Sequence, residues 1–322
     1  MNDFIETKLN DWQDILHINK TFLHPFIFRG QKNEEWELET SIERLIKHID
    51  NPICNAHYNI AERWMLSEFI RKFRLYNNTN IDKDNYIEWL SIMQHYGAPT
   101  RLLDFTASIF IAIFFAVVES EGDSAIWCVN KKILESNLVD NYKLPYKKLE
   151  ALKDEINLHH INFAQKFIAK ELSYSKNYPN TVVPIEPFII NERLARQQGL
   201  FLMPTNPNFT FLENLKNAFN NKEQNFEKKT IEELINISDE ESKEYSNNAM
   251  IEIIKMSLLK IDNKESIINL TKGKTKIIKI IIPKKLKKPI LDNLKHMNIT
   301  AEILFPGLEG LAKSLLHTQE VY

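Results

Sequence analysis

Residues 94–106 read QHYGAPTRLLDFT, and the rest of the chain is organised around this stretch. It carries seven polar or ionisable side chains in thirteen residues, and an apolar helix predicted over residues 107–118 follows at once. The break at Gly97-Ala98-Pro99 forces a turn after a helix predicted to end near Gln94, because proline cannot continue a helix. A polar cluster fixed at a bend and anchored in the core is typical of a functional site on a rigid element.

Two structural interpretations of this stretch stay open. Asp104 and Thr106 can cap the first amides of the following helix. Arg101 and Asp104 can instead form an internal ion pair that locks the bend, so that His95 and Tyr96 become the side chains presented to a ligand. A cap alone does not account for His95, Tyr96 and Arg101 together.

The composition is that of a globular protein with a substantial core, since 43% of the 322 residues are hydrophobic and 11% are aromatic. A net charge of −2 argues against nucleic-acid binding through bulk charge. Cys54 and Cys128 form neither a metal spacing nor a disulfide framework, and residues 1–6 lack the basic and apolar regions of a signal peptide. The longest apolar run covers residues 105–118, too short to span a bilayer, so we expect a protein of the reducing cytoplasm.

Arginine is used sparingly, with eight arginines against 33 lysines. Five of the eight lie in or beside short motifs: Arg29, Arg44, Arg101, Arg193 and Arg196. Because the planar guanidinium fork matches phosphate and carboxylate groups, these five are candidate ligand contacts.

The chain is predicted to fold as a single α+β domain, with a central mixed sheet of short strands surrounded by helices. Phe26-Ile27-Phe28 predicts a strand running into Arg29-Gly30-Gln31, which is either a ligand contact at a strand end or an ordinary surface turn. Further elements are predicted near the C-terminus: strand 275–282, helix 284–297, strand 300–305, a turn at 306–310 and helix 311–316. Residues 203–274 are polar and helical in pattern, and are predicted to form an insertion or lid.

Two further patterns bear on partners. Eight lysines lie within residues 272–288, where a solvated face and a local nucleic-acid contact are both open, since a patch can bind despite a neutral total. The pair His159-His160 has no third ligand nearby, so we expect no metal site there.

The motifs together resemble the FRG domain family, which is named for a Phe/Tyr-Arg-Gly motif. The resemblance rests on Phe28-Arg29-Gly30-Gln31, the segment 38–44, the long motif of residues 94–106, residues 193–201 and residues 304–310. It covers nearly the whole chain, with an expected core at residues 22–202 plus 275–316. It implies a bacterial or phage-defence setting, with a toxin or antiviral effector role and an antitoxin or defence partner.

The aromatic-Arg-Gly at the end of an early strand also resembles the first motif of Arg-Ser-Glu-type ADP-ribosyltransferases. This resemblance implies NAD as a substrate and a carboxylate near the ribose, where positive charge develops as the nicotinamide bond breaks. Glu309 or Asp104 is then the carboxylate, His95 positions the ribose or acts as acid–base, and Tyr96 stacks on nicotinamide. The implied binding set is Arg29, Gly30, Gln31, Arg44, Tyr96, Thr100, Arg101, Arg193 and Gln197. The chain departs from that family in lacking a Ser-Thr-Ser strand motif and a Glu-x-Glu or Gln-x-Glu pair.

Three functions follow as hypotheses. The first is an NAD-dependent ADP-ribosyltransferase-like enzyme that modifies nucleic acid or protein. The second is a non-enzymatic sensor that binds a nucleotide or phosphorylated ligand through its arginines. The third is a hydrolase or nuclease using His95 and Asp104, which the absence of paired carboxylates at metal spacing disfavours.

Overall fold

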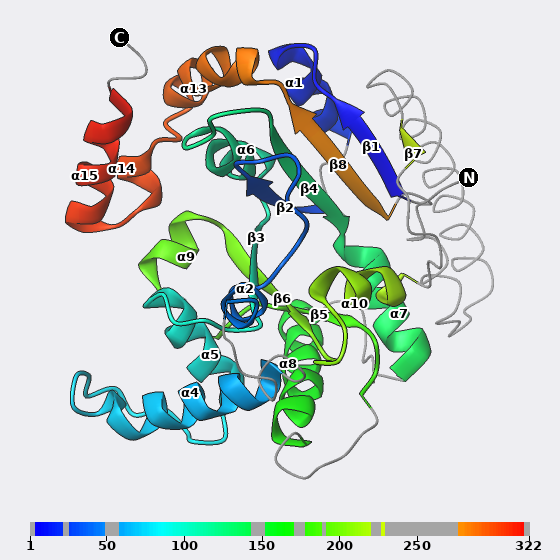
Figure 1. Cartoon of the computed structure of the whole chain (residues 1–322), viewed down its shortest axis with the longest axis vertical. Coiled ribbons are helices and arrows are strands. Elements are labelled where there is room, and N and C mark those ends of the chain that lie inside the picture. Colours follow the sequence, from blue (N-terminus) through cyan, green and yellow to red (C-terminus); the bar gives the residue numbers. More distant parts are fainter. Residues whose placement is uncertain are drawn as a thin grey trace, which may run out of the picture.

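The computed structural model describes residues 4–21, 26–48, 58–142, 152–170, 178–188, 191–219, 227–228 and 276–318. Within them, one mixed sheet runs through the molecule and helices pack on both of its faces (Figure 1). The predicted α+β class and the central mixed sheet are therefore confirmed.

The sheet has eight strands among the described residues, in the order β5-β6-β3-β2-β4-β8-β1-β7. Their bounds are β1 Phe4–Lys8, β2 Phe26–Gln31, β3 Leu103–Thr106, β4 Ser124–Asn130, β5 Val182–Ile185, β6 Gly199–Pro204, β7 Glu227–Lys228 and β8 Ile277–Ile282. The pairings from β5 to β8 are antiparallel, whereas β1 runs parallel to both β8 and β7. Strand β2, which carries the Phe-Arg-Gly motif, lies in the middle of the sheet.

Helices surround this sheet. In the first half of the chain they are α1 Trp12–Thr21, α2 Ser41–Ile46, α4 Tyr58–Phe73, α5 Tyr86–His95, α6 Ile109–Val117 and α7 Lys131–Tyr142. The second half comprises α8 Leu152–Lys170, α9 Glu192–Arg196, α10 Phe211–Ala218, η2 Lys284–Leu286, α13 Lys287–His296, α14 Ala301–Leu304 and α15 Gly307–Thr318. Helices α1, α6 and α13 gather at one end of the molecule, and α4, α5 and α8 gather at the other (Figure 1).

The apolar side chains of β2 point alternately to the two faces of the sheet and contribute to two separate parts of the core. Phe26 and Phe28 pack on α6, in a cluster shared with β1, β4, β8 and α13. Ile27 faces the opposite side of the sheet, in a cluster with Trp127 and the buried residues of α10. Successive strand residues point to opposite faces, so the two core layers follow directly from the sequence of this strand.

Three predictions of local structure need correction. Residues 300–305 were expected as a strand, but α14 is a helix, because Ala301 and Leu304 share one helical face and are 3% and 2% exposed. The last helix begins at Gly307, so the expected turn at 306–310 is largely its first turn. Strand β3 was not predicted, because its four residues lie between the bend and the apolar helix and pair with β6, far away in sequence.

The predicted insertion at residues 203–274 lies mostly outside the described residues. Its described part completes β6 and forms α10, whose Phe211 and Leu215 are fully buried. In the part of the chain that the structure describes, no helix combines the length and the apolarity needed to cross a membrane.

Candidate functional site: a cleft lined by arginines

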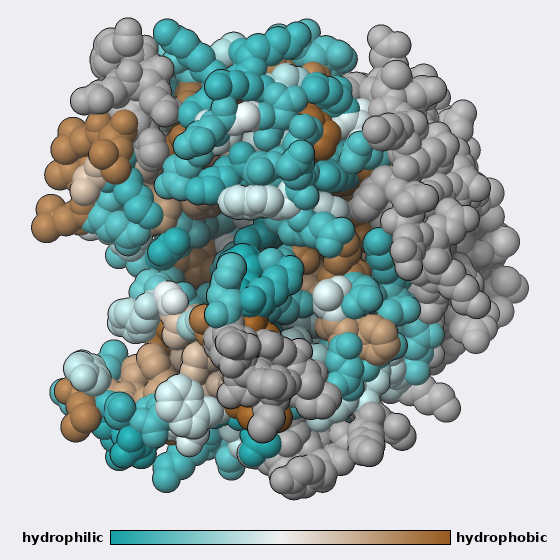
Figure 2. Space-filling model, in the orientation of Figure 1, coloured by the Kyte–Doolittle hydropathy of each residue, from teal (hydrophilic) through white to brown (hydrophobic). Residues whose placement is uncertain are grey.

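A cavity of about 980 Å³ opens beside the middle of the sheet. Its walls come from β2, β3, the loop after β2, α2, the end of α5 and α9. The space-filling view is hollowed near its centre, and teal polar residues surround the hollow (Figure 2). The cavity collects residues that lie more than 150 positions apart in the sequence, from Arg29 to Gln197.

Gly30 brings β2 into direct contact with α6. A Cβ at this position would lie 2.0 Å from the carbonyl oxygen of Ala112 and 2.6 Å from the amide nitrogen of Ala116. Both atoms belong to the backbone of α6, so they cannot move aside as a flexible side chain would. The glycine of the Phe-Arg-Gly motif is therefore required for packing, and it fixes the position of Arg29 beside it.

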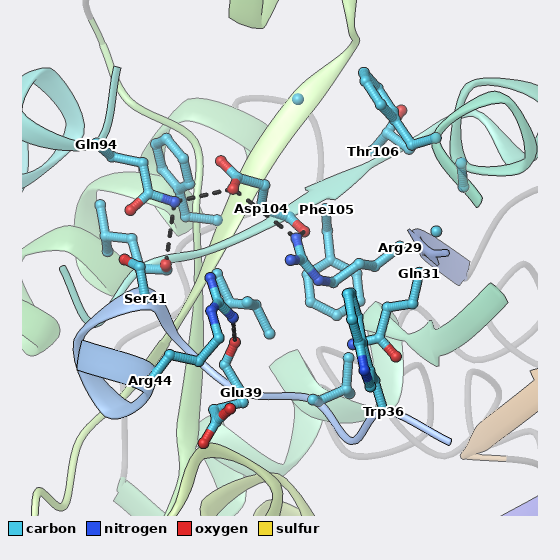
Figure 3. A pocket seen from close by; sticks show the side chains of 18 of the residues that line it. Arg29, Gln31, Trp36, Glu39, Ser41, Arg44, Gln94, Asp104, Phe105 and Thr106 are labelled. Carbon is cyan, nitrogen blue, oxygen red and sulfur yellow. Dashed lines mark hydrogen bonds and ion pairs between the residues drawn. The ribbon is translucent and has the colours of Figure 1, made fainter. Parts of the chain in front are cut away.

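Arg29 extends from β2 into the cavity (Figure 3). Its Nη1 donates a hydrogen bond of 2.8 Å to the main-chain oxygen of Asp104 and lies 3.9 Å from that residue's Oδ2. Its Nε is buried and has no hydrogen-bond partner among the described residues. Burial lowers the pKa of Arg29; Asp104 opposes this effect and the charge of Arg44 adds to it. Because arginine carries five N–H donors, this guanidinium can donate further hydrogen bonds to an oxygen in the cavity that it lines.

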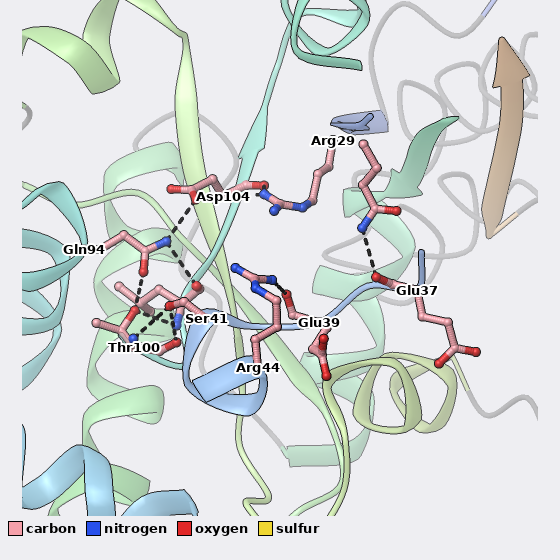
Figure 4. Close-up of polar contacts among 10 residues, drawn as sticks. Arg29, Glu37, Glu39, Ser41, Arg44, Gln94, Thr100 and Asp104 are labelled. Carbon is pink, nitrogen blue, oxygen red and sulfur yellow. Dashed lines mark hydrogen bonds and ion pairs between the residues drawn. The ribbon is translucent and has the colours of Figure 1, made fainter. Parts of the chain in front are cut away.

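Arg44 is the second cation of the cavity and comes from α2. That helix begins with a capping box in which Thr40 and Glu43 bind each other's backbone amides. Its first residue, Ser41, donates to and accepts from the backbone of Thr100, so α2 is fastened to the bend. The Nη1 of Arg44 donates to the main-chain oxygen of Glu39 at 2.7 Å (Figure 4). The acceptor is a neutral carbonyl, so this hydrogen bond does not neutralise the charge of the guanidinium.

Asp104 is held in the cavity by a short chain of side-chain hydrogen bonds. The hydroxyl of Thr100 donates to the Oε1 of Gln94. The Nε2 of Gln94 then donates to the main-chain oxygen of Leu102 at 3.1 Å and to the Oδ2 of Asp104 at 2.9 Å (Figure 4). Because its oxygen accepts from Thr100, the amide of Gln94 must point its N–H groups at Asp104.

His95 ends α5 and lines the cleft, where the charges of Arg193 on α9 and Glu309 on α15 act on it. Burial, followed by the charge of Arg193, lowers the pKa of His95, and Glu309 acts in the opposite sense. Arg193 and Glu309 lie 3.9 Å apart across these two helices. Gln197 also lines the cavity and donates to the main-chain oxygen of Leu304 at 3.2 Å, which ties α9 to α14.

The structure brings most of the predicted site residues to this cleft. The predicted residues that line it are Arg29, Gly30, Gln31, Arg44, His95, Asp104, Arg193 and Gln197. Four others are not among its described lining residues: Tyr96, Thr100, Arg101 and Glu309. Tyr96 is 66% exposed, with its ring 4.9 Å from that of His95, and Glu309 pairs with Lys313 at 2.9 Å.

The expected ion pair between Arg101 and Asp104 is wrong. Arg101 is fully buried, and both its backbone amide and its Nε donate to the carboxylate of Glu62, at 2.6 and 2.5 Å. Asp104 faces Arg29 instead. The carboxylate of Glu62 comes from α4, 39 residues earlier in the sequence, and it matches both donors of Arg101 at once.

Gln94 and Trp36 line the cleft, and the sequence analysis assigned no role to either of them. Gln94 belongs to the central motif but was counted only as a polar residue. Its place at the end of a helix, ten residues before Asp104, is the feature of the sequence that could have indicated a contact between them. Trp36 lies on the loop after β2, where a single aromatic residue in a polar segment gives little indication of function.

Other predicted contacts lie away from the cleft. Of the lysine run at residues 272–288, Lys279 lies 3.7 Å from Glu6, and the Nζ of Lys287 donates to the main-chain oxygen of Ser120. The nucleic-acid contact of this run stays a prediction. Among the described residues, no group of three or more His, Cys, Asp or Glu side chains is arranged to hold a metal ion.

Comparison with protein families gives one match. A model described as the FRG domain matches residues 24–124, a segment that contains β2, α2, the bend and β3. Comparison with curated proteins and with solved structures finds no significant match.

Proposed function

We propose that the cleft of this chain, which matches the FRG domain over residues 24–124, binds NAD and that the protein is an ADP-ribosyltransferase-like enzyme. The observation that carries this proposal is the pair of arginines from two separate elements, Arg29 and Arg44, at one cavity. They are close enough for the charge of Arg44 to lower the pKa of Arg29. A diphosphate supplies the negative charge and the acceptor oxygens that such a pair requires.

The cavity also has the size and the chemistry for a dinucleotide. At about 980 Å³ it lies at the upper end of ordinary ligand pockets, which hold about 300–1,000 Å³. The guanidinium groups of Arg29 and Arg44 line this space and offer donors to phosphate oxygens. Phe28, Phe105 and Phe115 supply apolar wall between the polar groups.

In the proposed reaction, the bond between the ribosyl carbon and nicotinamide breaks, and nicotinamide leaves with the bonding electrons. Asp104 is the carboxylate that stabilises the positive charge developing on the ribose. It lines the cavity, whereas Glu309 does not and is engaged with Lys313. Gln94 and Arg29 orient Asp104 through the contacts described above.

His95 is the proposed general base. Burial lowers its pKa, which favours the neutral imidazole, and this form can take the proton from the acceptor as the acceptor's oxygen or nitrogen attacks the ribosyl carbon. With water as the acceptor, the products are nicotinamide and ADP-ribose. A protein or nucleic-acid nucleophile gives a modified macromolecule, which is the expected product of a toxin or a defence effector.

The test is incubation of the full chain with NAD labelled in its adenosine half, alone and with cell protein or nucleic acid. We expect nicotinamide release and transfer of label. Arg29→Ala and Arg44→Ala should each weaken NAD binding by at least about tenfold, which is the loss of one charge-assisted hydrogen bond. Arg71→Ala is the matched control, since Arg71 pairs with Glu68 on the outer surface of α4.

Asp104→Asn separates binding from chemistry. It should bind NAD and fail to release nicotinamide. NAD binding by the wild type without any nicotinamide release would overturn the transferase and favour a nucleotide sensor, a function in which Asp104 only holds Arg29. Cleavage of nucleic acid in the absence of NAD would instead favour the hydrolase. Absence of NAD binding would refute the assignment of the cleft.

A further inference from the structure

Trp36 is a large apolar side chain that is held in an exposed position at the cleft. It lines the cavity and is 48% exposed. In the close-up it lies next to Arg29 and Gln31, on the opposite side of the cavity from Gln94 (Figure 3). An indole that is left half in water at the edge of a cavity has a surface available for a ligand with a planar ring.

The loop that carries Trp36 is fixed by hydrogen bonds. The amide of Trp36 donates to the main-chain oxygen of Asn33 at 3.3 Å, and the side chain of Gln31 donates to the main-chain oxygen of Glu37 at 2.9 Å. Gln31 is in turn held by the indole N–H of Trp127, which donates to its Oε1 at 2.7 Å. The ring of Trp36 is therefore presented by an ordered loop, so binding a ligand does not have to order the segment first.

One further contact bears on the ring. The Nζ of Lys32 lies 5.8 Å from the ring centroid of Trp36, within the range of a cation–π interaction. The side chain of Lys32 also lines the cavity. A base stacked on Trp36 thus has a cation beside it, and the phosphate attached to its sugar lies toward Arg29 and Arg44.

We propose that Trp36 is the stacking platform for the adenine of NAD. This inference rests on the proposed function and adds the direction in which the dinucleotide lies. Three groups follow one another across the cavity: the indole of Trp36, the cations of Arg29 and Arg44, and the carboxylate of Asp104 (Figure 3). The order matches base, diphosphate and reactive ribose, so the nicotinamide end lies at Asp104 and the adenine end at Trp36.

The test is calorimetric titration of the full chain with ADP-ribose, AMP and nicotinamide mononucleotide. Trp36→Ala should weaken ADP-ribose and AMP by about 5- to 150-fold, the range seen when a base loses an aromatic platform. Trp36→Phe should keep most of the affinity, because a phenyl ring still stacks. Trp64→Ala is the matched control: Trp64 is 69% exposed on α4 and is not among the described lining residues.

Nicotinamide mononucleotide has no adenine, so its affinity should be unchanged in Trp36→Ala. An equal loss for all three ligands, or no loss for any, would overturn the assignment of Trp36.

The proposed stacking role of Trp36 and the proposed transferase activity can be refuted independently of each other. If Trp36 governs AMP binding while NAD is never cleaved, the platform stands and the transferase falls. If NAD is cleaved with the same KM in Trp36→Ala, the transferase stands and the platform falls. A wild-type chain that binds none of the ligands overturns both.

Discussion

The ion pair between Glu62 and Arg101 gives the sharpest prediction about what holds the cleft together. Glu62 is 2% exposed and Arg101 is fully buried. The two oxygens of the carboxylate each accept one hydrogen bond from Arg101, one from the backbone and one from the side chain. Replacing Glu62 with glutamine keeps the shape of the side chain but removes the negative charge that faces the buried guanidinium.

The size of the effect follows from this burial. Removing one partner of a buried ion pair costs about 3–5 kcal/mol, because the other charge stays desolvated. Unfolding of a chain of this length has an entropy of about 0.7 kcal/mol per degree, so the melting temperature should fall by about 4–7 °C. The double variant Glu62→Gln/Arg101→Met removes both charges, and it should recover most of this loss.

The assay is thermal unfolding followed by circular dichroism, together with ADP-ribose titration at a temperature where every variant is folded. Glu68→Gln is the control on the same helix; its carboxylate pairs with Arg71 and Lys72 at the surface, and the melting temperature should not change. ADP-ribose affinity of folded Glu62→Gln should equal that of the wild type. A stable Glu62→Gln chain with lost ligand binding would show that Arg101 contacts the ligand, and would refute the structural role.

Three further predictions test other parts of the molecule. Gly30→Ala should lower the free energy of unfolding in urea by at least about 1–3 kcal/mol, because its Cβ meets the backbone of α6. Gln94→Leu should reduce kcat for nicotinamide release by roughly tenfold at unchanged KM, since the Asp104 carboxylate loses an orienting hydrogen bond. Burial, followed by the charge of Lys131, lowers the pKa of His160 to about 4. The unfolded chain therefore binds the proton first, and stability should fall by about 3 kcal/mol as the pH drops from about 6.5 to 4, as urea titrations would show; His160→Asn should lack this loss.

The elements that the sequence predicts well are those whose signal is local. The strand predicted from Phe26 to Phe28, the helix ending beside Gln94 and the turn at Gly97, with φ of +80°, are confirmed and have local signals. Arg29-Gly30-Gln31 was expected at the strand end or in a turn, but it continues β2 and pairs with β4. Strand β3 depends on pairing with β6, almost 100 residues away, and four residues carry too little pattern to reveal it. The prediction of a strand at residues 300–305, where α14 lies, was wrong for a related reason: a single turn of helix and a short strand can share one apolar pattern.

The arginines show the same limit at the site. Sequence reasoning selected five arginines as one class, on scarcity and motif position: Arg29, Arg44, Arg101, Arg193 and Arg196. Their roles differ because of partners that are distant in sequence: Arg101 meets a buried carboxylate, whereas the Nε of Arg29 has no partner among the described residues. The amino-acid sequence alone does not indicate which arginine is already paired with a carboxylate. That pairing becomes visible only in the three-dimensional structure.

The central motif then performs two tasks through one connected set of bonds. Glu62 fixes Arg101, and with it the backbone of the bend. Thr100, next to Arg101, orients the amide of Gln94, which in turn orients Asp104 in the cleft. Glu62 is linked to Asp104 through the backbone of the bend. A folded variant that keeps the bend in place therefore also keeps the geometry of Asp104. Loss of the ion pair should therefore change the temperature at which the cleft is lost, while the rate per folded molecule stays the same below that temperature.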